Sequence, residues 1–393
     1  MLPIVPLLVL ATETTNVAPP LAADPIISAL QTGSAAPDDV GVEGKSTFDR
    51  LSFDAAGRMR GESTFDQPSG EDRHRGRLRF RVGAGYQLTD SVTARARLST
   101  LSDGRDANNP HWDFGDGGNA FAATEFGLDR FHLDWAAHDN VMLHAGKFGH
   151  VFTRPTVLGE VMWDDDVQPT GFAEVWKPEA ISESSRFDVR GAQYVAVENG
   201  SANDATMFGL QGNFFHDVDE KIHLQIAASF SSWAGEGEGI ALGGGNQGNS
   251  PGEQFATLET FVQAKFDHAD RMSTTASVQF MTNTDDDSGE DNGFVVGAQY
   301  GASGKEKDYN FFGAFYTLDA NALYSPVSQD DTPIAGTGVS TGIGANTGMD
   351  GLIGGGQYFI TDTFSMKLWF LTSNANAEED PLRIRLDFDF IIK

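Results

Sequence analysis

The chain has 393 residues and no cysteine, and its 27 Lys and Arg against 56 Asp and Glu give a formal net charge of −29. Neutralising nucleic-acid phosphates requires a basic face, so this balance argues against a nucleic-acid partner. The sequence holds no apolar run long enough for a helical membrane span. The pattern of residue types does not change after about residue 48, which favours one repeated architecture.

The N-terminal residues differ from the rest. Met1 to Ala11 are apolar and have the length of a signal-peptide core, and the small residues Ala22 and Ala23 follow. No Lys or Arg precedes Lys45, so the usual basic start is missing. We predict a cleaved or truncated export segment over 1–23, the alternative being a disordered apolar tail. Residues 24–48, rich in Ala, Pro, Gly and Asp, are predicted to be a linker.

From about residue 50 onward, apolar and polar side chains alternate. Ile222, Leu224 and Ile226, for example, interleave with His223 and Gln225. Successive side chains of a strand point to opposite faces, so each such run has one apolar face and one polar face. We predict about sixteen strands from this period. Their expected ranges are 50–61, 75–88, 91–101, 125–137, 141–149, 170–177, 186–198, 204–215, 221–233, 255–267, 271–283, 292–301, 308–318, 348–361, 363–373 and 382–392.

The breaks between these strands alternate between short and long. Leu88 to Ser91 and Asp267 to Asp270 are short, whereas 102–124, 150–169, 234–254 and 319–347 are long. Long two-faced strands joined in this way are typical of a transmembrane β-barrel with short periplasmic turns and long outer loops. The predicted fold is therefore all-β: a single antiparallel up-and-down barrel over 49–393, in the bacterial outer membrane.

Arginines recur at every second position in five of the predicted strands. In a closed barrel the last strand pairs with the first, so these five strands are neighbours. Facing lipid, each arginine would cost roughly 2–4 kcal/mol at mid-depth, so we expect a basic wall that lines the pore. Its members are Arg58, Arg60, Arg77, Arg79, Arg81, Arg95, Arg97, Arg130, Arg383 and Arg385.

Loop 150–169 is a candidate source of counter-charge, because it ends in Trp163 followed by Asp164, Asp165 and Asp166. Folded into the pore, these acids would face the arginines and create a transverse field that sorts solutes by charge and size. Alternatively the loop stays outside, and the arginines pair with Asp54, Asp387 and Asp389. The wall itself has a second interpretation, a structural salt-bridge lattice filling a plugged barrel.

The stretch from Gly127 to Trp135, the pair Gly146-Lys147, the segment Trp163 to Asp166 and the pair Gly171-Phe172 resemble the putative porin family of Gram-negative outer membranes. The resemblance covers about 50–393 in architecture and about 75–176 in motif. It implies a trimer-capable or monomeric barrel for passive diffusion. It also implies pore-loop acids at Asp164, Asp165 and Asp166, opposite Arg77, Arg79, Arg95 and Arg97.

Barrels of this family usually end in an aromatic residue that the barrel-assembly machinery, an expected partner, reads. Here Phe390 is followed by Ile391, Ile392 and Lys393.

These observations predict a porin that lets small hydrophilic solutes and ions diffuse passively through a water-filled barrel. One rival is an anion- or phosphate-selective channel that uses the arginines as a binding ladder. A second is an outer-membrane barrel enzyme with His144 or His150 in its catalytic set. A third is a soluble β-rich adhesin or solenoid. Because no catalytic, nucleotide or metal motif is found, we expect no enzyme activity, cofactor or metal. The partners expected are membrane lipid, small solutes and ions.

Overall fold

The computed structural model describes residues 48–66, 71–101, 111–114, 124–198, 204–234, 255–285, 289–324, 327–329, 331, 347–374 and 380–392. The chain divides into two units, 1–36 and 37–393, and all described residues belong to the second. The predicted export segment 1–23 lies outside the described residues, as does the predicted linker 24–48 apart from Phe48.

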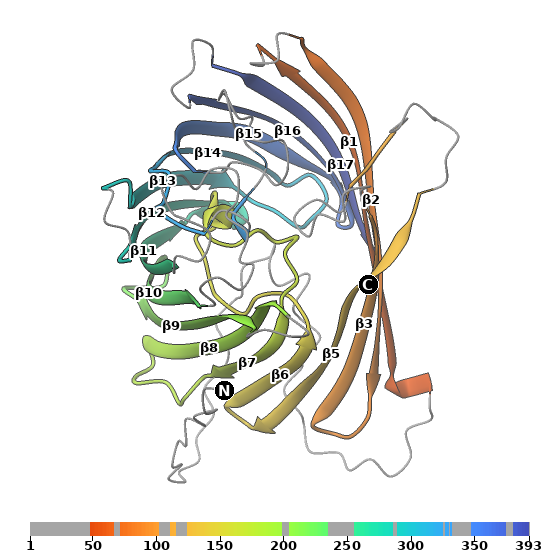
Figure 1. Ribbon diagram of the computed structural model, residues 1–393, viewed down its shortest axis with the longest axis vertical. Coiled ribbons are helices and arrows are strands. Elements are labelled where there is room, and N and C mark those ends of the chain that lie inside the picture. Colours follow the sequence, from red (N-terminus) through yellow and green to blue (C-terminus); the bar gives the residue numbers. More distant parts are fainter. Residues whose placement is uncertain are drawn as a thin grey trace. The chain divides into compact units, whose positions relative to one another are not determined.

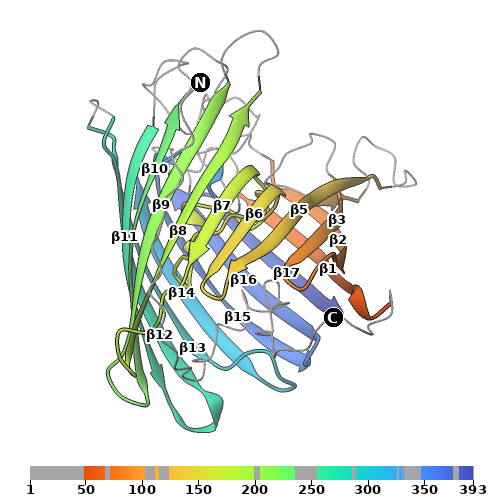
Figure 2. The same ribbon diagram turned by 90° about the horizontal axis from the view of Figure 1, so that it is seen from below.

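The described residues form one antiparallel sheet that closes on itself, because β1 pairs with both β2 and β17. Figure 1 shows the strands as a ring, and Figure 2 shows their tilt. The strands are β1 (Leu51–Phe65), β2 (Arg73–Gln87), β3 (Val92–Thr100), β4 (Trp112–Asp113), β5 (Phe126–His138), β6 (Val141–Lys147), β7 (Thr170–Trp176), β8 (Ser185–Val197), β9 (Ala205–Asp217), β10 (Ile222–Ala234), β11 (Phe255–Asp267), β12 (Ser273–Asn283), β13 (Asn292–Gly301), β14 (Tyr309–Leu318), β15 (Met349–Thr361), β16 (Phe364–Asn374) and β17 (Leu382–Ile392).

The predicted fold, an antiparallel barrel of about sixteen long strands, is confirmed. The largest boundary difference is in β1, which continues to Phe65. The two-residue strand β4 was not predicted, since it falls in the long break 102–124. It exists because β3 pairs with β2 only from Arg81 to Gln87, which leaves the outer part of β2 open. There Trp112 and Asp113 pair with Leu78 and Arg77.

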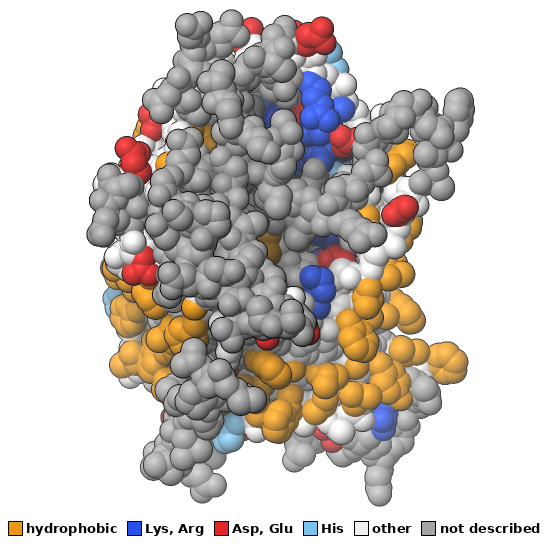
Figure 3. Space-filling model, in the orientation of Figure 1, with side chains coloured by type: hydrophobic (Ala, Val, Ile, Leu, Met, Phe, Trp, Pro, Cys, Tyr) orange, Lys and Arg blue, Asp and Glu red, His pale blue; other side chains and the backbone are white. Residues whose placement is uncertain are grey.

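The barrel has an apolar outer face, as the alternation predicts. On β2, the outward positions Leu78, Phe80 and Val82 alternate with inward arginines that contact other lumen residues. In Figure 3, hydrophobic side chains gather over the outer edge formed by β3, β5 and β6, whereas Lys and Arg lie within the ring near β1 and β17. An exterior that prefers lipid and an interior that holds charge is the arrangement of an outer-membrane barrel.

The inner face is apolar along part of the wall, which the sequence did not predict. Inward residues of β8 to β16, including Tyr194, Trp233 and Tyr316, form a buried cluster. Two connections cover this cluster from inside the barrel. The β6–β7 connection contributes Trp163 and its neighbours, and the β14–β15 connection contributes Tyr324. The rings of Trp233 and Tyr324 lie 4.3 Å apart, and those of Trp163 and Trp233 lie 5.9 Å apart.

The helical elements with bounds in the described residues are short 3₁₀ turns: η1 (Phe48–Arg50), η3 (Gly159–Val161) and η4 (Ala269–Arg271). None of them has the length and apolar character needed to cross a membrane.

The outward face predicts where a charge is tolerated. Leu368 on β16 is 55% exposed on that face, and Val218 in the β9–β10 turn is 52% exposed. We expect Leu368→Arg to destabilise the folded barrel by about 2–4 kcal/mol, because it places a guanidinium in lipid. Val218→Arg should change stability by less than about 0.5 kcal/mol. Guanidinium unfolding in phospholipid vesicles measures both, and equal effects would contradict the assigned faces.

Candidate functional site

The predicted arginines lie on adjacent strands, in the order β17–β1–β2–β3–β5. The pairing of neighbouring strands places these side chains next to one another across the wall. Arg60 stands beside Asp387 on β17 and beside Arg77 on β2. Arg58 likewise stands between Asp389 and Arg79. Strands far apart in sequence therefore build one charged surface.

The β17–β1 part of this surface is an ion-pair lattice. Arg58 donates from Nε to Asp389 Oδ1 at 2.7 Å, and Arg60 donates to both carboxylate oxygens of Asp387, at 2.7 and 3.0 Å. Arg385 donates from Nε to Glu62 Oε2 at 2.5 Å. Asp387 also accepts from the indole of Trp369, whose ring carries the guanidinium of Arg60 at 5.3 Å. Bidentate pairs of this kind fix side-chain positions as well as neutralising charge.

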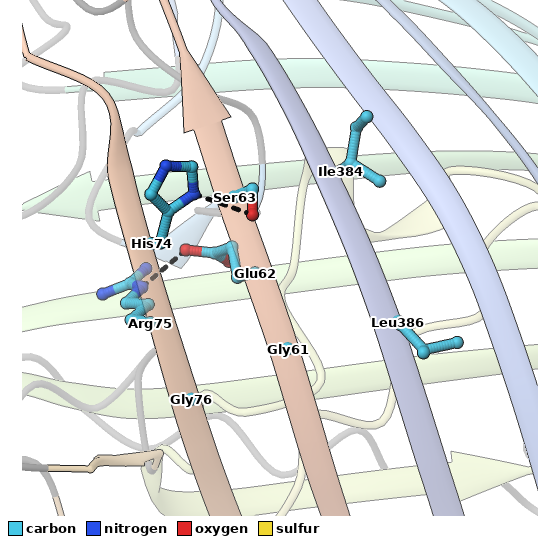
Figure 4. Close-up of a pocket in the computed structure, with 8 residues that line it drawn as sticks. All are labelled: Gly61, Glu62, Ser63, His74, Arg75, Gly76, Ile384 and Leu386. Atoms are coloured by element: carbon cyan, nitrogen blue, oxygen red, sulfur yellow. Dashed lines mark hydrogen bonds and ion pairs between the residues drawn. The ribbon is translucent and has the colours of Figure 1, made fainter.

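On β2, Arg75 and Arg77 contact two different acids. Arg75 donates to Glu62 Oε1 at 2.5 Å, the pair drawn in Figure 4, and to Asp113 Oδ2 at 3.0 Å. Arg77 donates from Nε to Asp113 Oδ1 at 2.7 Å. The unpredicted strand β4 thus delivers a carboxylate to the wall. Glu62 joins two strands, because Arg75 and Arg385 hold its two oxygens.

The β6–β7 connection reaches the same wall through Asp166. Arg79 Nη1 lies 2.8 Å from Asp166 Oδ1, and Arg81 Nη2 lies 2.7 Å from the same oxygen. Burial alone would raise the pKa of Asp166, but Arg79 and Arg81 hold that pKa well below its usual range. Asp166 is therefore ionised at neutral pH and bridges two guanidinium groups.

The other two predicted pore-loop acids have partners within the connection itself. Asp164 Oδ1 accepts from the backbone N–H of Asp166 at 2.7 Å, which shapes the turn. Asp165 pairs with Arg154 of the same connection. Their role as pore-loop acids stays a prediction.

The far side of the connection is anchored on other strands. Thr153 N–H donates to Gln211 Oε1 on β9 at 2.6 Å, and Thr156 N–H donates to Gln263 Oε1 on β11 at 2.7 Å. Since Asp166 contacts β2, the connection extends inside the ring from β9 and β11 to β2 (Figure 1).

A second connection, between β14 and β15, also supplies a carboxylate. Asp331 pairs with Arg385 and lies 3.7 Å from Arg60 Nη1. Burial would raise its pKa, but Arg385 and Arg60 keep that pKa far below its usual range. The two connections bind each other through backbone bonds, from Asp164 N–H to Val327 O at 2.9 Å and from Gln329 N–H to Glu160 O at 3.0 Å.

The remaining wall arginines contact groups on β5, on β1 and in the two connections. Arg95 donates to Asp134 Oδ2 at 2.6 Å, and Arg97 donates to Asp129 Oδ2 at 2.7 Å. Arg130 donates to Gln168 Oε1 at 2.6 Å. On β17, Arg383 donates to Thr64 Oγ1 and to the backbone oxygen of Asp331.

The histidines that the enzyme alternative requires have other contacts. His144 Nδ1 lies 2.8 Å from Asp134 Oδ1, the carboxylate that also binds Arg95. His150 stacks on Trp163 with ring centroids 5.6 Å apart. Burial, reinforced by the nearby Arg154, lowers the pKa of His150 to about 3, so this imidazole is neutral. No group of three or more His, Asp or Glu suited to a metal occurs in the described part of the chain.

Four acids of the lattice were not predicted: Glu62, Asp113, Asp129 and Asp331. Glu62 follows Arg58 and Arg60 in phase, so strict alternation could have found it. Strict alternation along β5 would point Asp129 outward, since its neighbour Arg130 points inward. A register shift between Arg97 and Leu98 turns Asp129 inward as well. Asp113 and Asp331 lie in long breaks, where no period places a side chain.

The geometry predicts unequal roles for neighbouring acids of one connection. Asp166→Asn removes the carboxylate that Arg79 and Arg81 share and leaves Arg81 only the more distant Asp129, 3.6 Å away. We expect a loss of about 3 kcal/mol in unfolding free energy. Asp165→Asn is the matched control. Because Asp165 is 46% exposed, its loss should cost less than about 1 kcal/mol. Denaturant unfolding in lipid vesicles tests this, and equal losses would contradict the assignment.

Comparison with known proteins agrees with this architecture. Residues 49–236 match the family described as putative porin. No curated protein matches the sequence significantly. The high-pH structure of Pseudomonas putida OprB has a TM-score of 0.58 at 10% identity, over 88% of this chain and 95% of that chain. A triple mutant of the Rhodopseudomonas blastica porin has a TM-score of 0.48 at 13% identity, over 86% and 100%. Over residues 49–236, just under half of its length, the chain is thus similar to the family described as putative porin.

Proposed function

We propose that this barrel lets small hydrophilic solutes and ions cross the outer membrane passively, along the arginine wall. The observation that carries the proposal is a closed strand ring with an apolar exterior and a charged inner wall. Arg95 and Arg58 on this wall keep 33% and 21% of their side chains accessible. Family and fold indicate a channel rather than an enzyme.

The passage is narrowed by the two inward connections. They pack on the apolar inner face of β8 to β16, so water and solutes are left with the side lined by arginine. At Asp166, opposite charges stand within hydrogen-bond distance. Adjacent fixed charges of opposite sign produce a local transverse field that orders polar solutes and restricts their size.

The local charge supports a weak preference for anions. Among the described residues, twelve cationic side chains face this part of the lumen: the ten predicted arginines, Arg75 and Lys367. Eight carboxylates pair with them. The twelfth, Lys367, extends over the rings of Phe312 and Trp369 instead of a carboxylate. Charges on outer loops are screened beyond about 8 Å at physiological salt, so the local excess outweighs the acidic total.

The same excess favours a second candidate, an anion- or phosphate-selective channel in which the arginines form a binding ladder. The two candidates differ in the strength of phosphate binding. Block of chloride current by low phosphate concentrations would favour the ladder, whereas additive currents would favour general diffusion.

Removing either partner of the Arg79–Asp166 ion pair should shift the reversal potential in opposite directions. Arg79→Ser removes a positive charge and leaves Asp166, so the reversal potential under a KCl gradient should move toward cation selectivity. Asp166→Asn should move it toward anions, and the double variant should return near wild type. Single-channel recording in planar bilayers measures all three. If both single variants shift in the same direction, or neither shifts, this ion pair does not control selectivity.

A carboxyl group in the β6–β7 connection predicts a pH dependence. Burial, reinforced by the neighbouring Asp165, raises the pKa of Glu160 to about 8. Glu160 is therefore mostly protonated at pH 7 and becomes anionic as the pH rises through 8. Between pH 7 and 9 the anion preference should fall, and Glu160→Gln should remove this change. A pH profile unaltered by the substitution would exclude Glu160 as its source.

A further inference from the structure

Three glycines interrupt the outward face of β1 and β2: Gly57, Gly61 and Gly76. The barrel covers two of them with its own side chains, since the ring of Phe390 lies over Gly57 and the ring of Phe114 lies over Gly76. Gly61 is different. Apart from its two chain neighbours, a Cβ built on Gly61 would meet no atom of the described chain within 4 Å. Gly61 therefore leaves a gap in the lipid-facing surface.

The gap belongs to a hollow of about 490 Å³ on the outside of β17, β1 and β2 (Figure 4). Gly61 stands beside Gly76 of β2 and beside Leu386 of β17, so two glycines form the floor of the hollow. Ile384 and Leu386 supply its apolar side. Sites that hold small molecules measure about 300–1,000 Å³, so the hollow can hold a bound molecule.

One end of the hollow is polar. Ser63 of β1 and His74 of β2 are paired in register and line the hollow, with His74 Nδ1 3.0 Å from Ser63 Oγ (Figure 4). Beyond them, where β1 ends and β2 begins, Asp66 and Asp72 are exposed and joined by a hydrogen bond from Asp66 N–H to Asp72 Oδ1 at 3.2 Å. The hollow thus passes from apolar side chains to hydrogen-bond donors, with two carboxylates above them.

The polar end lies at the depth of lipid headgroups. β1 has 15 residues and ends at Phe65, on the side of the long outer loops. Fifteen residues rise roughly 50 Å along the strand, or about 35 Å across the membrane at a tilt of about 45°, whereas the apolar band is about 25 Å tall. A centred strand therefore extends about 5 Å beyond each edge of the band. Ser63 lies about 5 Å below the strand end, at the edge, and Gly61 lies about 10 Å below it, among acyl chains.

We propose that this hollow is a binding site for one phospholipid whose headgroup carries both a phosphate and an ammonium group, as in phosphatidylethanolamine. One acyl chain lies over Gly61, where no side chain of the barrel fills the surface. The phosphate accepts hydrogen bonds from His74 and Ser63, and the ammonium group lies near Asp66 and Asp72. These carboxylates would repel a headgroup that is only negative. The inference does not depend on what passes through the pore.

Filling the hollow tests the site. Gly61→Leu puts a side chain where the acyl chain would lie, and Gly212→Leu is the matched control, because Gly212 is an outward glycine of β9 with an equally open Cβ. The barrels are placed in nanodiscs with equal amounts of phosphatidylethanolamine and phosphatidylglycerol, and native mass spectrometry identifies the lipid that stays bound after release. We expect wild type and Gly212→Leu to keep one phosphatidylethanolamine, and Gly61→Leu to keep at least tenfold less.

Three outcomes would overturn the proposal: no bound lipid on wild type, equal retention by a folded Gly61→Leu variant, or a second protein chain in place of the lipid that only Gly61→Leu removes. Heat-modifiable migration in gels shows whether each variant is folded.

A second pair of variants tests the headgroup and leaves the glycine floor intact. We expect His74→Leu to reduce the retained phosphatidylethanolamine about tenfold, because the phosphate loses a donor. The double variant Asp66→Asn with Asp72→Asn should bind phosphatidylglycerol as well as phosphatidylethanolamine. Equal retention of the two lipids by wild type, or unchanged retention by a folded His74→Leu variant, would contradict the proposed site.

Discussion

Inside a bilayer the backbone has no water to bond with, so each strand must find a partner on both sides. The pairing of β1 with β17, from Ala55↔Ile392 to Phe65↔Leu382, meets this requirement and removes the last free edge. It also decides the chemistry of the lumen. Arg58 and Asp389 are 331 residues apart in sequence, and only closure brings them within 2.7 Å. The charged wall is thus a product of the ring.

The period of two explains why so much of this barrel could be predicted from its sequence. A strand with lipid on one side and water on the other must alternate, and a slip of one residue would expose every arginine to lipid. The predicted range 292–301 therefore matches β13 residue for residue, and 382–392 matches β17. The same period placed Arg77 and Arg79 inward without any knowledge of their partners.

Several of their partners required information that the period does not contain. Asp129 faces inward because of a bulge, which reverses the phase of its strand. Asp331 and Asp166 are carried by connections whose paths depend on tertiary packing, and only Asp166 had a motif to mark it. The apolar inner face was hidden for a related reason. Trp233 and Tyr316 looked like ordinary strand residues until the connections that cover them were placed.

The two inward connections are held at three places: by aromatic packing, by mutual backbone bonds, and by one acid each on the arginine wall. Breaking any one of these leaves the other two in place. If one connection moved out of the ring alone, a wall arginine would lose its carboxylate partner. The backbone hydrogen bonds between the two connections would also break. The two connections are therefore expected to move as one body and not separately. Under the proposed function, the two connections together set one fixed upper limit on the size of solute that passes.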